Sequence, residues 1–321
     1  MTERLDEATV AARLAALAPR LVADATGVQS LRRLTGGASM ATFAFDVAVR
    51  GGAPVPLILR RRAVAPDDDS PPLAREAQVI AAAVAGGVPA PEVLHVCCPD
   101  DGLGEGYVMR RLTGETLGKR IATDPAFAPA RAILAGQCVD TIDAAETLAR
   151  YERIWRQSGA VRPAIEAAFR WLEARLPHTQ VGPRLVHGDF RNGNMMVDPD
   201  RGLVAVLDWE LAHVGDPAED IGWICCNSWR FAQAGARVGG FGDLDDLLAG
   251  YVAAGGDPID PARIDLWQMM ASLKWGVMTM QMHRSFAEDP AAGPERGVIG
   301  RRLSEAEADI VALLHRGSPR C

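Results

Sequence analysis

Three polar residues in the second half of the sequence have the types and the spacing that phosphoryl transfer requires. Asp189 and Asn194 lie five residues apart in the segment HGDFRNGN (187–194), and Asp208 directly follows an apolar run. A carboxylate can orient and deprotonate an attacking hydroxyl, and carboxylate and amide oxygens are ligands that Mg²⁺ prefers. We therefore predict that Asp189 is the catalytic base and that Asn194 and Asp208 are ligands of Mg²⁺.

A β-hairpin is predicted to bring these residues together. Apolar runs at 195–197 and 203–207 flank the segment DPDRG (198–202), and Pro and Gly in an acidic segment favour a turn. The two strands of a hairpin return to the same end, so we expect Asp189, Asn194 and Asp208 to lie close in space.

The residues around the hairpin are predicted to support this loop. The segment DPAE (216–219) is typical of a helix start, with Asp216 as the cap, Pro at the first helical position and Glu219 reaching back from the third. We expect Asp220 to brace the catalytic loop and His187 to have a structural role in it. For Arg191, contact with phosphate and contact with solvent both remain open.

The rest of the sequence predicts an α+β fold with two lobes. A helix is expected from Leu5 to Leu21 and another at 73–85, with strands at 41–49, 55–60, 93–97 and 106–111. From Gly114 onward the pattern is helical, with helices expected at 131–150 and 161–176. The predicted organisation is a small β-rich N-terminal lobe (1–111) and a larger helical C-terminal lobe (112–321).

The motifs resemble those of the aminoglycoside phosphotransferase family of small-molecule kinases. The residues that carry the resemblance are HGD (187–189), Asn194, LDWE (207–210) and GDPAEDIG (215–222). More narrowly, the chain resembles the phosphotransferase domains associated with acyl-CoA dehydrogenases. The resemblance implies a protein-kinase-like fold, ATP and Mg²⁺ as cofactors, and a kinase whose acceptor is an alcohol group. It places nucleotide binding in the N-terminal lobe and the acceptor site in the C-terminal lobe.

The resemblance also assigns a phosphate-binding cation. Arg60 occupies the strand position at which kinases carry a Lys, and Glu76, sixteen residues later, is its expected carboxylate partner. Arg keeps the charge of Lys and adds a bidentate fork. Arg61 and Arg62 remain alternatives, because the three arginines are consecutive.

Two further nucleotide contacts follow from the resemblance. Gly36 and Gly37 lie where a loop would cover the phosphates. Met109 would lie near the adenine, and backbone groups from Arg110 to Leu112, those of Arg111 among them, would pair with the base. An acidic residue is commoner than Arg110 after this Met in the family.

Glu210, Lys274 and Arg284 are candidates for binding the acceptor. Glu210 stands where protein kinases have the Gly of Phe-Gly. Lys274 and Arg284 are ten residues apart in a Met- and Trp-rich helix, and we expect both on a similar face. The positive charges of Lys274 and Arg284 predict an anionic acceptor. The resemblance points to a hydroxy acid or a hydroxyacyl thioester. For the Met and Trp residues themselves, core packing is favoured over a substrate wall.

Three alternatives remain. The first is an antibiotic kinase acting on an aminoglycoside or a macrolide. The second is a catalytically silent pseudokinase that only binds nucleotide. The third is a metal-dependent phosphohydrolase with His187, Asp189 and Asp208 as ligands, which would leave Arg60 and Glu76 unexplained.

Composition narrows the range of partners. The chain has 34 Lys and Arg against 41 Asp and Glu, a net charge of −7, which argues against binding to nucleic acid or to anionic membranes. The six cysteines include no C-x-x-C motif, the first residues are acidic where a signal peptide would be basic, and Lys274 interrupts the longest apolar run. We expect a cytoplasmic protein whose partners are a nucleotide and a small hydroxylated molecule.

Overall fold

The chain divides into two compact units. The computed structural model describes residues 5–34, 40–63, 72–85, 88–114, 144–176, 184–289 and 294–316. The first unit comprises Met1–Gly114 together with Val204–Glu210, and the second comprises Glu115–Leu203 and Leu211–Cys321. The sequence predicts a single boundary after residue 111. The return of Val204–Glu210 to the first unit was not predicted, and it assigns Asp208 to that unit.

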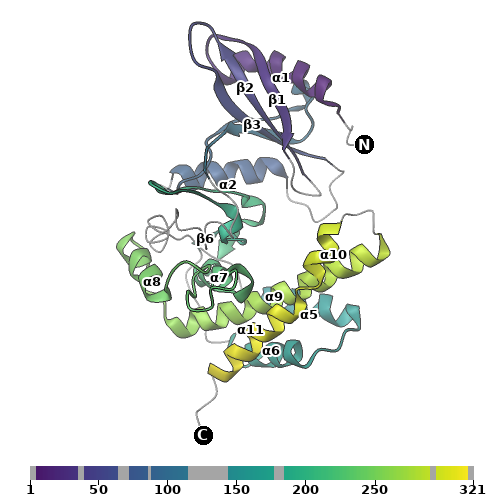
Figure 1. Ribbon diagram of the computed structural model, residues 1–321, viewed down its shortest axis with the longest axis vertical. Helices are drawn as coiled ribbons and strands as arrows, with labels where there is room; N and C mark the ends of the chain where they lie inside the picture. The colour runs from purple at the N-terminus through teal and green to yellow at the C-terminus, as the bar shows by residue number, and fades with distance from the viewer. Residues whose placement is uncertain are drawn as a thin grey trace. The chain divides into compact units, whose positions relative to one another are not determined.

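The first unit contains a five-stranded antiparallel sheet with the strand order β1-β2-β3-β5-β4. Figure 1 labels its strands β1, β2 and β3. Its strands are β1 (Ala25–Leu34), β2 (Met40–Val49), β3 (Val55–Arg62), β4 (Val93–Val96) and β5 (Gly106–Arg110). Strand β1 was not predicted. It lies at the edge of the sheet and contains no fully buried residue, so the alternation that identifies a half-buried strand is missing.

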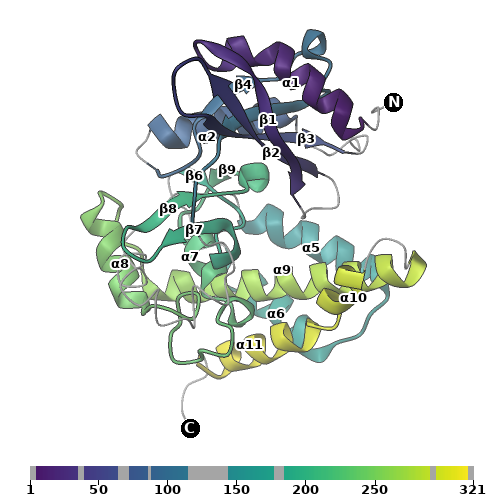
Figure 2. The same ribbon diagram turned by 45° about the horizontal axis from the view of Figure 1, so that its top comes forward.

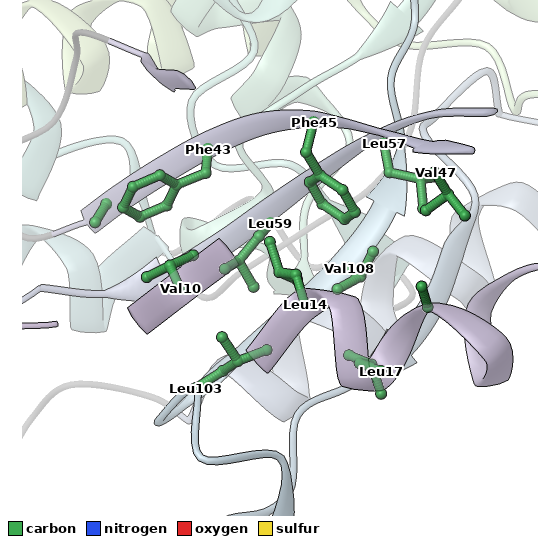
Figure 3. Close-up of a cluster of buried hydrophobic side chains, with 12 residues drawn as sticks. Val10, Leu14, Leu17, Phe43, Phe45, Val47, Leu57, Leu59, Leu103 and Val108 are labelled. Carbon is green, nitrogen blue, oxygen red and sulfur yellow. The ribbon is translucent and has the colours of Figure 1, made fainter. Parts of the chain in front are cut away.

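A single apolar cluster joins the first helix to this sheet (Figure 3). Helix α1 (Glu7–Leu21) begins where the side chain of Asp6 accepts a hydrogen bond from the N–H of Thr9. Its apolar face packs on the central strands, which fixes the strand that carries Arg60. The labelled members of the cluster are Val10, Leu14, Leu17, Phe43, Phe45, Val47, Leu57, Leu59, Leu103 and Val108. Helix α2 (Leu73–Ala85), predicted from the sequence with the same bounds, carries Glu76.

The second unit is built around one long helix, α9 (Pro261–Glu288) (Figure 2). Trp267, Met269 and Met270 in α9 are almost completely buried, so the prediction of core packing for these side chains is confirmed. The helices that pack on α9 are α5 (Ala144–Ser158), α6 (Pro163–Glu173), α7 (Ala218–Ile224), α10 (Pro294–Gly300) and α11 (Leu303–Arg316). Helix α8 (Leu244–Ala253) completes the described helices of this unit. Of the helix predicted at 131–150, residues 131–143 lie outside the described residues.

Two short sheets frame the predicted catalytic loop. Strand β6 (Arg184–Val186) pairs with β9 (His213–Gly215), and β7 (Met195–Asp198) pairs with β8 (Gly202–Val206). The predicted hairpin is therefore present. Its turn is held by the Asp198 carboxylate, which accepts the N–H groups of Asp200 and Arg201, both at 3.0 Å. Strand β9 has only three residues, too few for a pattern to identify it.

Helix α7 begins at Ala218, one residue later than predicted. Pro217 occupies the cap position, and Asp216 accepts the N–H of Ala218 at 2.9 Å while pairing with Arg263. Glu219 does not reach back to the helix start as predicted; its carboxylate is buried beside His213 and Lys274. None of the helices in the described part of the chain combines the length and the apolar character that crossing a membrane requires.

Candidate active site

Asp220 fixes the backbone of the loop that leads to Asp189. Its buried carboxylate accepts the N–H groups of His187 at 2.8 Å and of Gly188 at 3.0 Å. Burial raises the pKa of Asp220 well above the ordinary value of an aspartate, although these two N–H groups act in the opposite direction. The predicted bracing role of Asp220 is confirmed.

The backbone conformation directly before Asp189 requires glycine at position 188. Gly188 has a φ of +79°, and a Cβ atom there would lie 2.5 Å from the carbonyl oxygen of Leu211. Only glycine satisfies both constraints without strain. His187 is buried, and its Nδ1 accepts the N–H of Asp189 at 3.2 Å. This contact is in keeping with the structural role predicted for His187.

Three side chains donate hydrogen bonds to the Asp189 carboxylate. Asn194 Nδ2 lies 2.7 Å from Oδ2, Trp223 Nε1 lies 2.7 Å from Oδ1, and Arg191 Nε lies 3.1 Å from Oδ1 and 3.2 Å from Oδ2. Arg191 also lies over the ring of Trp229, 4.8 Å from its centroid. Arg191 therefore contacts Asp189 and Trp229, and its contact with phosphate stays a prediction.

Trp223 is a site residue that the sequence analysis missed. It lies three residues after Asp220 on α7, so both side chains point to the same side of the helix. That spacing was the available signal, because Asp220 had already been assigned to the loop.

Lys274, predicted to bind the acceptor, has its contacts within the second unit. Its side chain is buried, Nζ donates to the carbonyl oxygen of Gly188 at 3.1 Å, and Nζ lies 3.7 Å from the Glu219 carboxylate. Arg284, in contrast, is largely exposed and lies 3.6 Å from Glu288. Ten residues at 3.6 per turn leave two side chains about 80° apart, so the two cations do not share a face.

The charge of Lys274 is maintained by its surroundings. Burial by itself would lower the pKa of Lys274, but nearby carboxylates, Glu219 foremost, raise the pKa above its ordinary value. A charged ammonium therefore lies next to the backbone that directly precedes Asp189.

In the first unit, Arg60 contacts three carboxylates. Its Nη2 lies 2.6 Å from Oδ1 of Asp208 and 3.1 Å from Oε2 of Glu210, and its Nε lies 3.6 Å from Oε1 of Glu76. The predicted pairing of Arg60 with Glu76 is therefore present, and Glu210 joins the same group.

The other two arginines of this strand have different partners. Arg61 Nε donates to the carbonyl oxygen of Leu103 at 2.7 Å, and Arg62 Nε donates to Glu105 at 2.7 Å. Among the three consecutive arginines, the structure thus selects Arg60 as the partner of Glu76 and Asp208.

Glu76 is buried between Arg60 and Tyr107, whose hydroxyl donates to Oε1 at 3.0 Å. Burial raises the pKa of Glu76 to about 7, while Arg60 and the Tyr107 hydrogen bond act to lower it. Tyr107 was missed by the sequence analysis. It is the residue of β5 directly opposite Arg60 of β3, a register that a sequence does not specify.

Asp208 has a backbone conformation that is uncommon for a residue other than glycine. Its φ is +66°, in the left-handed region, which Asp tolerates better than most residues. Trp209 anchors the following turn, because its buried indole Nε1 donates to the carbonyl oxygen of Val206 at 3.0 Å. The carboxylate of Asp208 is a third exposed.

The comparison with protein families decides the classification. The model of the phosphotransferase enzyme family (APH) matches residues 30–267. The chain belongs to this family. Its fold is kinase-like, with an N-terminal antiparallel five-stranded sheet followed by a largely helical region.

Individual relatives agree with this family membership. The chain is 29% identical over 245 residues to acyl-CoA dehydrogenase family member 11 of Gallus gallus, a match that covers 68% of this chain and 31% of that protein. It is 39% identical over 84 residues to family member 10 of Mus musculus, covering 26% of this chain and 8% of that protein. These matches therefore span less than a third of the length of either relative.

Two solved structures show the fold. A structure from Ralstonia eutropha assigned to the aminoglycoside phosphotransferases has a TM-score of 0.71 at 19% identity, over 95% of this chain and 98% of that chain. Aminoglycoside phosphotransferase APH(4)-Ia, in complex with AMP-PNP and hygromycin B, has a TM-score of 0.60 at 17% identity, over 92% and 96% of the two chains.

Two of the backbone N–H groups predicted to pair with the adenine already donate hydrogen bonds to neighbouring segments of the first unit. The N–H groups of Arg110 and Arg111 donate to the carbonyl oxygens of Glu92 (2.9 Å) and Pro56 (3.0 Å). Those two N–H groups are therefore engaged within the sheet, and the Arg111 guanidinium pairs with Asp46 at 2.7 Å. Met109 lies in β5 opposite Ile58. Gly36 and Gly37 lie outside the described residues.

The donor chemistry at the two predicted metal ligands fits Mg²⁺. The amide nitrogen of Asn194 donates to Asp189, both to its carboxylate and to its carbonyl oxygen at 2.9 Å, so the amide oxygen is the atom left to ligate. Asp208 supplies a carboxylate. Within the described ranges no group of three His, Cys, Asp or Glu residues is placed to hold a metal ion. Amide and carboxylate oxygens are ligands that Mg²⁺ prefers.

The same observations weigh against the phosphohydrolase alternative. That interpretation requires His187 as a metal ligand, but its Nδ1 accepts the N–H of Asp189 and the ring is buried. Arg60 and Glu76, which the alternative leaves unexplained, form a group with Asp208.

Proposed function

We propose that this phosphotransferase transfers the γ-phosphate of ATP to a hydroxyl of a small molecule, with Asp189 as the catalytic base. The observation that carries the proposal is the Asp189 carboxylate, which three donors from Arg191, Asn194 and Trp223 hold in one orientation. Phosphoryl transfer depends mainly on positioning and electrostatic stabilisation, so a fixed carboxylate is the feature that the reaction needs.

In the proposed reaction, Asp189 accepts a hydrogen bond from the acceptor hydroxyl and then its proton. The hydroxyl oxygen forms a bond to the γ-phosphorus while the bond from that phosphorus to the β,γ-bridging oxygen breaks, which releases ADP. Arg60, oriented by Glu76, neutralises charge on the phosphates. Arg60 fills the place of the usual strand Lys in this proposal, because its guanidinium reaches both Glu76 and Asp208.

Asn194 and Asp208 would hold Mg²⁺ through an amide and a carboxylate oxygen. Bound Mg²⁺ would neutralise charge on the phosphates and orient them. The sequence has Asp189, Asn194 and Asp208, the base and the two metal ligands of the proposed reaction. Their presence favours an active enzyme over a catalytically silent pseudokinase.

For the acceptor we propose a hydroxy acid or a hydroxyacyl thioester. The support is the similarity to family members 10 and 11 of the acyl-CoA dehydrogenases, whose names refer to acyl-CoA. The charge of Lys274 no longer supports this class, because Lys274 is buried and bonded to Gly188. Glu210 and Arg284 are left as candidates for acceptor contacts, and Glu210 is also a partner of Arg60.

An ATP-depletion screen tests the proposal. Hydroxy acids, hydroxyacyl thioesters, aminoglycosides, macrolides and choline-like alcohols are each incubated with ATP and Mg²⁺, with Asp189→Asn as the control. We expect the wild-type protein to form ADP with hydroxy acids and hydroxyacyl thioesters. The Asp189→Asn control should form no ADP with either class. Turnover restricted to aminoglycosides or macrolides would identify an antibiotic kinase. Phosphate release from phosphoesters without ATP would identify the hydrolase instead.

A further inference from the structure

We infer that Trp223 and Lys274 are positioning residues that hold Asp189 from beneath the catalytic loop. The inference rests on the proposed function, because it takes Asp189 as the base. Neither residue is required to touch the substrate. Both lie in the second unit, with Asp189, so their contacts are local to one compact body.

Trp223 provides the direct contact. Its indole N–H donates to Oδ1 of Asp189 at 2.7 Å, and the side chain is almost completely buried. A hydrogen bond to a carboxylate is stronger than one between neutral groups, and an indole has only two side-chain torsions through which to move. Trp223 therefore restrains the orientation of the carboxylate more firmly than an exposed partner would.

Lys274 links the loop to Trp223. Its ammonium donates to the carbonyl oxygen of Gly188, directly before Asp189, and lies 4.6 Å from the centroid of the Trp223 ring. A cation over the face of an indole attracts it, and the attraction is larger when the pair is buried. One ammonium thus fixes both the backbone before Asp189 and the ring that donates to its carboxylate.

A close approach of helices α7 and α9 holds Trp223 and Lys274 near each other. A Cβ atom at Gly222 would lie 2.5 Å from the backbone carbonyl carbon of Trp267, so only glycine lets α7 approach α9 at this point. Gly222 directly precedes Trp223, and Lys274 follows Trp267 by two turns on the same helix. The helix contact therefore fixes the distance between the ammonium and the indole.

Core packing alone does not account for the Trp223 contact. Trp223, Trp229 and Trp275 form one aromatic cluster, with centroids 4.8 to 6.4 Å apart. The buried indole N–H groups of Trp229 and Trp275 have no hydrogen-bond partner among the described residues, whereas that of Trp223 is aimed at Asp189. All three tryptophan rings contribute to the packing of this cluster, but only the Trp223 indole donates a hydrogen bond to Asp189.

The first test is spectroscopic and requires no acceptor. In a ¹H–¹⁵N spectrum of the full chain, Trp223→Phe and Trp275→Phe assign two of the seven indole N–H signals. We expect Asp189→Ala to shift the Trp223 signal upfield, as an indole that has lost a carboxylate partner does, and to leave the Trp275 signal in place. An unchanged Trp223 signal would overturn the inference.

The second test is kinetic and uses ADP release in the presence of Mg²⁺ and ATP, with water or the acceptor from the screen. Trp223→Phe keeps an aromatic ring under Lys274 but removes the indole N–H together with part of the bicyclic ring, a loss of volume that the matched control reproduces. We expect kcat to fall about 10-fold or more, with the KM values for ATP and acceptor within about twofold of wild type. The matched control, Trp275→Phe, loses the same atoms from the same cluster and should keep its kcat within about threefold.

The role of Lys274 needs a charge-balanced variant. Lys274→Met alone leaves Glu219 and Asp220 buried without their cation, and such a variant is expected to fold poorly. Lys274→Met combined with Glu219→Gln removes one charge of each sign. We expect this double variant to move the Trp223 indole signal and to lower kcat at unchanged KM for ATP. An unmoved signal in a folded double variant would remove Lys274 from the proposal.

Failure of the inference is distinguishable from failure of the proposed function. If Asp189→Asn loses turnover but Trp223→Phe behaves like Trp275→Phe, Asp189 is the base and the positioning role is wrong. If Asp189→Asn keeps near-normal turnover, the proposed function is wrong, whatever the spectra show.

Discussion

Arg60 Nη2 lies 2.6 Å from Asp208 Oδ1, although 148 residues separate the two in the chain. The contact joins the proposed phosphate-binding cation to a proposed metal ligand. Glu210 and Glu76 surround the same guanidinium. Nucleotide phosphates that bind Arg60 must therefore compete with carboxylates already in contact with it.

Arg60→Lys is expected to raise the KM for ATP about 10-fold with a smaller effect on kcat. A Lys ammonium is a point charge and cannot contact Asp208, Glu210 and Glu76 in the geometry of a planar guanidinium. Steady-state kinetics at varied ATP measures the effect. Arg62→Lys, in the same strand but paired with Glu105, is the matched control. Equal KM values in the two variants would show that Arg60 has no special role.

Asp189→Asn is expected to lower kcat about 10²- to 10⁴-fold while the affinity for Mg²⁺–ATP changes little. The substitution keeps the shape of the side chain and removes the base. Single-turnover kinetics and calorimetry measure the two quantities on the same preparation. Near-normal turnover would exclude Asp189 as the base.

Asp208→Ala is expected to abolish detectable binding of Mg²⁺–ATP in calorimetry. The variant deletes an anionic ligand and also leaves Arg60 with one fewer carboxylate. Asp200→Ala, in the exposed turn between β7 and β8, removes the same charge away from the site and should bind normally. Unchanged binding by Asp208→Ala would show that another residue holds the metal.

The stability of the protein is expected to fall as the pH rises through 7, in part because of Glu76. Its folded-state pKa is about 7, above its ordinary value of 4.5, so its contribution is complete below pH 4.5 and is lost as the carboxyl ionises. Since one pKa unit corresponds to about 1.4 kcal/mol, the loss is of the order of 3 kcal/mol at most.

Glu76→Gln removes this titration, so the difference in unfolding free energy between variant and wild type should change between pH 5 and pH 8. Denaturant unfolding at the two pH values measures it, with Glu92→Gln, exposed and paired with Arg110, as the control. Parallel pH dependences for wild type and Glu76→Gln would contradict the assignment of a raised pKa.

Gly188→Ala is expected to destabilise the second unit by about 2 kcal/mol and to lower turnover. An alanine there must adopt a positive φ and place its Cβ against the carbonyl oxygen of Leu211. Thermal unfolding and kcat are measured together. Gly159→Ala also places alanine at a positive φ, but no atom lies within 4 Å of its Cβ, so it isolates the cost of the dihedral angle. Equal losses of stability in both variants would exclude the clash at Gly188.

The parts of the fold that were predictable from sequence are those with strong local signals. The strands around Arg60 and the hairpin before Asp208 have apolar runs bounded by Gly and Pro, and helix α2 is amphipathic with a clear start and end. The loop spacing likewise predicted that Asp189 and Asn194 lie close together, and their side chains are hydrogen-bonded. Each of these signals is contained within about fifteen residues.

What could not be predicted depends on contacts between distant segments. Tyr107 reaches Glu76 because of strand register, and Trp223 reaches Asp189 because α7 lies beneath the loop. Lys274 looked like a surface cation in an apolar helix, but the carbonyl oxygen of Gly188 and the carboxylate of Glu219 compensate its burial. A buried cation with partners from other elements has no local signature in sequence.

The membership of Val204–Glu210 in the first unit has a consequence for recombination between relatives. A chimera that exchanges only residues 1–114 would combine Arg60 and Glu76 of one parent with Asp208 and Glu210 of the other. The Arg60 guanidinium would then contact two carboxylates from a different parent sequence. The N–H of Val206 donates to the carbonyl oxygen of Pro89 at 2.7 Å, and in the chimera these two residues would also come from different parents. Compatible exchange therefore requires three crossovers, one after residue 114 and one on each side of the seven-residue segment 204–210, so that this segment is transferred with the N-terminal block.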